Sequence, residues 1–200
     1  MSNKAAHKHL SDDPIMKKLI KQFDLPAWSY NGDLFLDLIG SIIGQQLSVK
    51  AGTTIENRFL DLFPKRRPTA KQILKIPDEK LRKCGMSYGK IKYIKGICES
   101  VINKQLKFET LHELSDEEVI SELVKLKGVG RWTAEMFIMF CLGRPDIFSF
   151  GDLGLKNAVA RLYSIDRNDL KKIEKISIKW SPHRTLACRY LWKSLDNEPK

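Results

Sequence analysis

The sequence has few of the features that indicate an extracellular, membrane-spanning or zinc-binding protein. Its four cysteines include no CxxC pair, which disfavours both a zinc site and a disulfide framework. No apolar run approaches the roughly 18 residues of a membrane-spanning helix. The segment from Met1 to Lys8 is polar and lacks the apolar core of a signal peptide. We therefore expect an intracellular protein with no membrane partner.

Acidic residues are outnumbered by basic ones. The chain has 35 Lys and Arg against 24 Asp and Glu, a formal net charge of +11, and a pI near 9.5. Such a surplus implies a polyanionic partner or an anionic surface, and charge alone does not distinguish the two. Hydrophobic residues make up 42% of the 200 positions, enough to bury a core in one or two compact units.

Alternation of β-branched and polar residues, the pattern of a strand, is nearly absent. Apolar residues instead recur at helical spacing behind capping residues, as at Asp13-Pro14. A string of short helices implies an all-α fold. One helix is expected to begin at residue 14, and the other expected helices span residues 33–43, 48–62, 69–76, 78–83, 87–103, 115–126, 131–142, 152–163, 168–180 and 183–195.

Two glycines one residue apart, Gly128 and Gly130, separate two helical segments. A GxG by itself most often marks an ordinary helix–helix turn. Here a capping box of Ser115 and Glu118 opens the helix before the turn, and a nearly all-apolar helix follows it. Tight turns at the start of a helix present bare backbone amides, which bind anions well. We therefore expect a grip on the phosphates of one DNA strand.

Several motifs in one order carry a family resemblance. The blocks are His9-Leu10 with Asp13-Pro14, Ile43-Gly44-Gln45-Gln46-Leu47-Ser48, Gly85-Met86-Ser87 with Lys90, Leu126-Lys127-Gly128-Val129-Gly130-Arg131-Trp132-Thr133-Ala134, Gly151-Asp152-Leu153-Gly154 and Trp180-Ser181-Pro182-His183-Arg184. Together they resemble the helix-hairpin-helix base-excision DNA glycosylases, and most of all the bacterial 3-methyladenine DNA glycosylase II group. The cysteines separate the chain from endonuclease III-like members, whose iron-sulfur cluster needs four closely spaced cysteines.

The resemblance implies one glycosylase unit over residues 1–200, built from two helical subdomains that flank a cleft. Residues 31–145 would form the part that contains the hairpin. Residues 1–30 and 146–200 would form the part made of the terminal helices.

Asp152 follows a Gly/Pro-containing loop and precedes an apolar helical pattern. Its simplest role is that of a helix N-cap. The preceding Ile147 to Phe150, however, would place apolar side chains around the carboxylate, where it could stabilise the positive charge that develops on a sugar as its glycosidic bond breaks. The resemblance matches Asp152 to the catalytic aspartate of the family. Asp146 is the nearest alternative for the catalytic carboxylate, but its place after Pro145 is more typical of a turn.

The resemblance also implies a substrate pocket formed by Trp132, Met136, Phe148 and Leu153. An indole ring can stack on a purine that alkylation has made cationic. Bifunctional members carry a Schiff-base lysine where this chain has Trp132, so we expect release of the base without a strand nick. A cationic base leaves readily, and Glu135 is expected to be solvated or structurally paired rather than a proton donor.

DNA contacts are expected in three segments. By resemblance, Gln46 or Leu47 would fill the gap left by a base flipped out of the helix, with Gln45 near the opposite base. The helix start at Ser87 and Lys90 would make a second phosphate contact. All of the expected DNA-binding residues are Gln45, Gln46, Leu47, Ser48, Ser87, Lys90, Lys127, Gly128, Val129, Gly130, Arg131 and Thr133.

These features predict a monofunctional DNA glycosylase that removes alkylated purines such as 3-methyladenine and 7-methylguanine from duplex DNA. Two alternatives stay open: a noncatalytic helix-hairpin-helix DNA-binding module, and a glycosylase for deaminated or oxidised bases. We expect a monomer that needs no cofactor and no side-chain metal site. The resemblance implies Na+ or K+ on backbone carbonyls of the hairpin when DNA is bound, and a location in the bacterial cytoplasm or nucleoid or in a eukaryotic nucleus.

Overall fold

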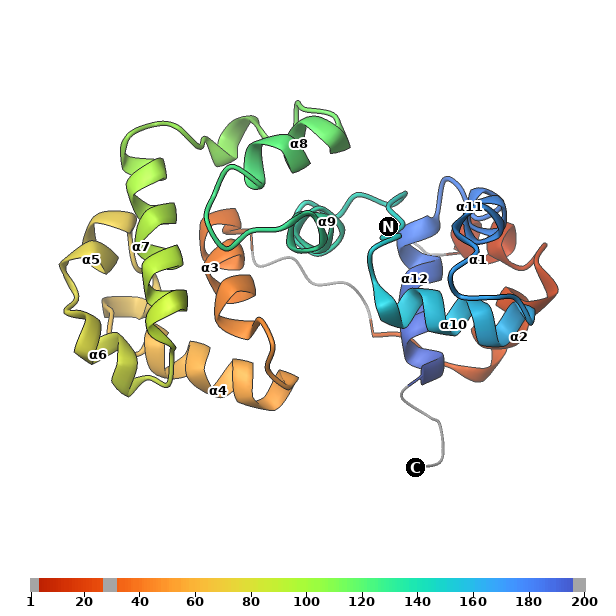
Figure 1. Ribbon diagram of the computed structural model, residues 1–200, viewed down its shortest axis with the longest axis horizontal. Coiled ribbons are helices and arrows are strands. Elements are labelled where there is room, and N and C mark those ends of the chain that lie inside the picture. Colours follow the sequence, from red (N-terminus) through yellow and green to blue (C-terminus); the bar gives the residue numbers. More distant parts are fainter. Residues whose placement is uncertain (1–3, 27–31, 196–200) are drawn as a thin grey trace. The chain divides into compact units, whose positions relative to one another are not determined.

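The computed structural model describes residues 4–26 and 32–195, and these divide into two compact units (Figure 1). We call residues 32–142 the hairpin unit, and residues 4–26 with 143–195 the terminal unit. No strand occurs in the described ranges, in keeping with the expected all-α fold. No helix in those ranges is long and apolar enough to cross a membrane.

The boundaries between the units differ slightly from those expected. The first expected boundary, between residues 30 and 31, lies outside the described residues. The second was expected after residue 145, whereas residues 143–145 belong to the terminal unit. The reason is local hydrogen bonding, because Thr185 donates through its amide to Pro145 O at 2.9 Å and through its hydroxyl to Arg144 O at 2.7 Å.

The hairpin unit is built around one long helix, α7, with α3 and α5 packed along it in Figure 1. Ile91, Ile94 and Ile97 form the buried face of α7. Each such side chain contributes roughly 1.5–3 kcal/mol when it leaves water. The helices of this unit are α3 (Leu34–Gly44), α4 (Val49–Leu60), α5 (Ala70–Lys75), α6 (Asp78–Lys83), α7 (Tyr88–Ile102), α8 (Asp116–Leu123) and α9 (Arg131–Phe140), with short 3-10 turns η1 (Pro64–Arg66) and η2 (Phe108–Thr110).

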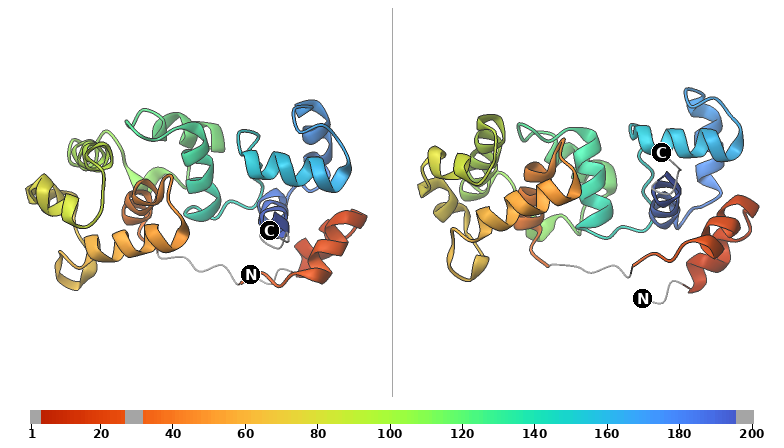
Figure 2. Two further views of the ribbon diagram at one scale, coloured as in Figure 1. Left: turned by 60° about the horizontal axis from the view of Figure 1, so that its bottom comes forward. Right: turned by 90° about the horizontal axis from the view of Figure 1, so that it is seen from below.

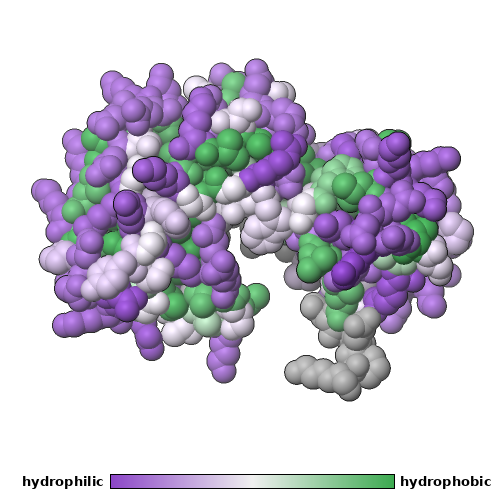
Figure 3. Space-filling view, in the orientation of Figure 1, coloured by the Kyte–Doolittle hydropathy of each residue, from purple (hydrophilic) through white to green (hydrophobic). Residues whose placement is uncertain are grey.

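The terminal unit is built around its last helix, α12, against which α10 and α2 pack, as the two views of Figure 2 show. Nearly every turn of α12 buries residues, among them Ala187, Cys188 and Leu191. Polar residues cover most of the visible face of each unit, and apolar groups reach it in small separate areas (Figure 3). The helices of this unit are α1 (Lys4–Leu10), α2 (Pro14–Gln22), α10 (Leu153–Tyr163), α11 (Leu170–Ile178) and α12 (Arg184–Leu195).

Asp13 joins α2 to the end of α10 and to the turn between α11 and α12. Its Oδ1 caps α2 by accepting hydrogen bonds from the Ile15 and Met16 amides at 2.9 and 3.2 Å. Its Oδ2 accepts from the Tyr163 hydroxyl at 2.6 Å and from Trp180 Nε1 at 3.2 Å. Burial and the hydrogen bond to Asp13 raise the pKa of Tyr163, which keeps the hydroxyl protonated as a donor.

The structure differs from the sequence-based expectation mainly at helix ends. The helix expected to reach residue 126 stops at Leu123, because the chain turns there and the Leu126 amide donates to Leu123 O. Helix α1 was not expected. Its last residue, Leu10, is buried, and His7 pairs with the Tyr190 hydroxyl 183 residues away, so tertiary contacts stabilise it.

We predict that Asp13→Ala lowers the free energy of unfolding by about 2–4 kcal/mol, because it removes a helix cap and takes the acceptor from the half-buried Tyr163 hydroxyl and the buried Trp180 indole. Asp169, which caps only its own helix α11 through the Lys172 amide, is the matched control. Asp169→Ala should cost about 1 kcal/mol. Urea unfolding of both variants measures the difference, and equal losses would show that the contacts to Tyr163 and Trp180 contribute nothing.

Candidate functional site

The hairpin between α8 and α9 requires glycine at residue 128. Gly128 has φ +90°, and a Cβ atom there would lie 2.3 Å from Cδ2 of Tyr93 on α7. The flat ring of Tyr93 therefore packs directly against the backbone of the turn. Val129 is buried, and its amide donates to Leu126 O at 3.1 Å, so this residue stabilises the turn from inside.

Gly130 faces open space. It has φ −91°, and a Cβ atom there would meet nothing within 4 Å. It occupies the N-cap position of α9, and among the described residues no side chain caps this end of the helix. The first amides of a helix carry a partial positive charge and bind a phosphate well. The exposed start of α9, with exposed Lys127 just before the turn, is thus suited to a phosphate of one strand.

Arg131 already has partners within the protein. Its guanidinium donates to Glu117 at 3.0 Å and, through Nε, to Glu135 at 3.0 Å. The hydrogen bond with Glu117 raises the pKa of Arg131. Glu135 is 6% exposed, so the expectation of a structurally paired glutamate fits the structure. A contact between Arg131 and DNA stays a prediction.

The loop after α3 meets the hairpin through Gln45. Its Nε2 donates to Gly128 O at 2.9 Å and to Thr133 Oγ1 at 3.2 Å. The two side chains are thus hydrogen-bonded to each other, and the expected contacts of Gln45 with the opposite base and of Thr133 with DNA stay predictions. Gln46 follows with φ +58°, and both Gln46 and Leu47 are exposed.

Three further residues expected at DNA bind the protein's own backbone. Lys90 Nζ donates to Ile43 O and to Gln45 O, each at 2.7 Å, and it thereby satisfies carbonyls at the end of α3. Burial lowers the pKa of Lys90. Lys90 therefore has a structural role here, and its contact with a phosphate stays a prediction. Ser87 and Ser48 are exposed and cap α7 and α4 through the Lys90 and Ala51 amides.

Asp152 is the N-cap of α10 and is only 8% exposed. Its Oδ1 accepts hydrogen bonds from the Leu155 amide at 2.7 Å and from Trp192 Nε1 at 3.1 Å. A Cβ atom at Gly154 would lie 3.1 Å from this oxygen, so the glycine leaves room for the carboxylate. The helix cap and the buried carboxylate, which the sequence offered as separate interpretations, are thus one arrangement.

The expected pocket residues divide between the two units. Trp132 and Met136 lie one turn apart on α9, in the hairpin unit, and Trp132 is 46% exposed. Leu153, next to Asp152, is 57% exposed, so an apolar side chain lies at the surface beside the carboxylate. Phe148 is buried, with its ring 4.8 Å from that of Phe150, and thus belongs to the packed core behind Asp152.

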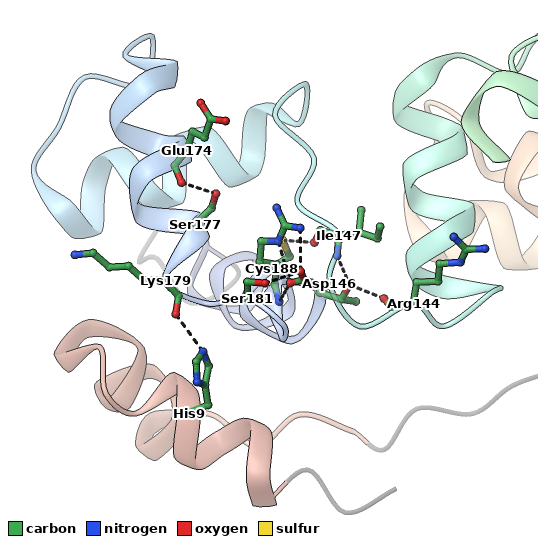
Figure 4. Close-up of polar contacts among 11 residues, drawn as sticks. His9, Arg144, Asp146, Ile147, Glu174, Ser177, Lys179, Ser181 and Cys188 are labelled. Carbon is green, nitrogen blue, oxygen red and sulfur yellow. Dashed lines mark hydrogen bonds and ion pairs between the residues drawn. The ribbon is translucent and has the colours of Figure 1, made fainter. Parts of the chain in front are cut away.

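Asp146, the competing carboxylate, is fully engaged in a structural network (Figure 4). Arg184 donates to it through its amide, Nε and Nη2 at 2.9–3.2 Å, and Ser181 through its hydroxyl at 2.7 Å. Burial alone would raise the pKa of Asp146, but the hydrogen bonds from Arg184 and Ser181 outweigh burial and hold the pKa below its ordinary value. This carboxylate fixes the loop before Asp152 to α12.

Residues 39–183 match the model of the HhH-GPD superfamily base excision DNA repair proteins. The chain belongs to this superfamily. It is 34% identical over 201 residues to the alkylbase DNA glycosidase-like protein mag2 of Schizosaccharomyces pombe, covering 95% of this chain and 92% of the relative.

Two solved members of the superfamily share the fold. A 3-methyladenine DNA glycosylase of Schizosaccharomyces pombe, in complex with abasic DNA, has a TM-score of 0.87 and 34% identity, covering 98% of this chain and 100% of that one. A DNA-3-methyladenine glycosidase of Bacillus halodurans has a TM-score of 0.81 and 35% identity, covering 94% and 88%.

The hairpin of this superfamily member offers backbone carbonyls to the Na+ or K+ that the resemblance implies. Gly128 O already accepts the Gln45 amide. A carbonyl oxygen has two lone pairs, so this hydrogen bond leaves room for a cation ligand. The cation stays a prediction.

Sequence reasoning missed two residues of the site, Trp192 and Tyr93. Trp192 lies 40 residues after Asp152 and binds its carboxylate, and Tyr93 packs beneath the hairpin. Neither carries a local signal, because a tryptophan or tyrosine in a helical pattern is normally interpreted as core. The two long-range contacts exist only in the folded chain.

We predict that Gly128→Ala destabilises the protein by about 1–3 kcal/mol, because alanine is strained at this φ and its methyl group would clash with the Tyr93 ring. Gly130→Ala, with ordinary φ and open space, should lose less stability, because only the preference for glycine over alanine at an N-cap is lost. Thermal unfolding tests both variants, and binding to duplex DNA should weaken in Gly128→Ala. Equal stability of the two variants would contradict the close approach of Tyr93.

We predict that Asp146→Asn costs about 2 kcal/mol at pH 7, the net value of hydrogen bonds to a charged group. The pKa of Asp146 is lowered in the folded state, so its stabilisation is complete above the ordinary pKa of about 3.9 and is lost as the pH falls through the lowered one. The difference between wild type and variant in urea unfolding should therefore shrink below about pH 4. A constant difference down to about pH 2.5 would refute this ionic role.

Proposed function

We propose that this protein is a DNA glycosylase that hydrolyses the bond between an alkylated purine and its deoxyribose in duplex DNA. The main support for this proposal is the Asp152 carboxylate. It is buried, it is oriented by the Leu155 amide and the Trp192 indole, and it lies at the positive end of α10. Membership in the HhH-GPD superfamily supports the reaction class. The alkylbase and 3-methyladenine names of the similar proteins support the class of substrate.

In the proposed reaction, one set of residues binds the DNA strand and another acts on the glycosidic bond. The start of α9 and the Gln46–Leu47 tip would hold the strand and fill the space of the extruded base, which costs a few kcal/mol to unstack. The bond between C1′ and the purine nitrogen then breaks, and its electron pair leaves with the base. The ionised Asp152 stabilises the positive sugar. A water oxygen bonds to C1′ and releases its proton to solvent, which leaves an abasic site.

The proposed substrate follows from Trp132 and from the charge of the base. An exposed indole attracts a cationic alkylated purine more strongly than a neutral one. Such a base departs without a proton donor, and the paired, buried Glu135 is not placed as one. Because Trp132 stands where bifunctional members carry lysine, this chain lacks the amine that would open the sugar, so the strand stays intact.

The proposed partner is double-stranded DNA that contains a damaged base, bound by a monomer inside the cell. The net charge of +11 supports a polyanionic partner. Binding without base release would indicate a noncatalytic module, and release of neutral bases would indicate a glycosylase for deaminated or oxidised DNA.

We predict that Asp152→Asn keeps its affinity for DNA with an abasic analogue and loses base release by on the order of a hundredfold or more, because the charge that stabilises the sugar is gone. Asp146→Asn, six residues earlier in the same loop region, is the matched control. It should still release bases under conditions in which the variant is folded. Chromatography of bases freed from methylated, deaminated and oxidised DNA measures the rates. Normal release by Asp152→Asn would exclude the assignment.

A further inference from the structure

The loop tip formed by Gln46 and Leu47 follows directly after Gln45, a residue that is anchored through both its side chain and its backbone. The Gln45 side-chain amide donates to Gly128 O and Thr133 Oγ1, which belong to the hairpin and to the first turn of α9. These hydrogen bonds span 83 and 88 residues of sequence. The loop is therefore attached to the same turn that presents amides to a phosphate.

The backbone of the same stretch is held by Lys90 of α7, which donates to the carbonyls of Ile43 and Gln45. Helix α7 also carries Tyr93, the ring on which Gly128 rests. One helix thus supports both the loop and the hairpin. The tip follows these anchored residues and is exposed, with Gln46 in the left-handed region and Leu47 40% exposed.

We propose that Gln45 is a positioning residue that couples the hairpin's hold on the DNA backbone to the insertion of the Gln46–Leu47 tip. The proposal rests on the proposed function, and it assigns Gln45 to the extrusion of the base rather than to contact with the opposite base. Its amide fixes the distance between the gripped phosphate and the tip.

The physical reason lies in the cost of extrusion. A tip can hold a base out of the stack only if it does not yield when the duplex closes again. Without the Gln45 hydrogen bonds the loop would retreat from the hairpin, and the stack would re-form. This cost is smallest for a mismatched base, which is already poorly paired. A coupling defect should therefore depend on how well the damaged base is paired.

The test uses Gln45→Met, which keeps the length of the side chain and removes its donor. Single-turnover release is measured from two duplexes with one 7-methylguanine, opposite cytosine in one and opposite thymine in the other. We expect the variant to lose about tenfold in rate on the paired duplex, the effect of one or two lost hydrogen bonds, and several-fold less on the mismatched duplex.

A fluorescent reporter separates positioning from general damage. With 2-aminopurine next to the lesion, the wild type should raise the fluorescence on binding, because the neighbouring stack opens. Gln45→Met should reduce this rise even at protein concentrations that saturate the duplex, so that the loss does not reflect weaker binding. Gln46→Ala, which shortens the tip itself, should show the same dependence on pairing.

Gln105→Met, the same substitution at an exposed turn after α7, is the matched control and should leave rate and fluorescence unchanged. Thermal unfolding verifies that each variant is folded. Equal losses on the two duplexes, or no loss on either, would overturn the coupling. Failure of the wild type to release any base would instead overturn the proposed function.

Discussion

The hairpin depends on the missing Cβ atom of Gly128. Because the backbone carries no side chain there, the Tyr93 ring of α7 can lie directly against it. This contact places the turn on the same helix that supplies Lys90 to the end of α3. The start of α9 and the loop with Gln46 are consequently held by one helix, which buries a continuous isoleucine face in the core.

The two carboxylates near the start of α10 differ in the groups that surround them, and these groups give the two side chains different roles. Asp146 receives a guanidinium and a hydroxyl, which neutralise it and fix its loop to α12. Asp152 receives a backbone amide and the Trp192 indole, which orient its carboxylate at the positive end of α10. The contacts of Asp146 stabilise the fold. An oriented carboxylate such as that of Asp152 is suited to stabilise a cation that develops beside it.

Most helices could be predicted from the sequence, because capping residues and apolar periodicity act locally. Asp13, Ser87 and Ser115 cap helices as the sequence indicated. The roles of Gln45 and Lys90 could not be predicted. Both looked like exposed polar residues available to DNA, and their partners lie more than 40 residues away in the chain.

The sequence by itself determined the all-helical class, the glycine turn, the capping position of Asp152 and the absence of a lysine at Trp132. These depend on backbone geometry and residue chemistry within a few positions. Only the tertiary structure decided which polar groups remain at the surface and which pair internally. That choice arises from burial, because a donor that loses water contacts, such as the half-buried Lys90 ammonium, must find acceptors, and packing of distant helices supplies them.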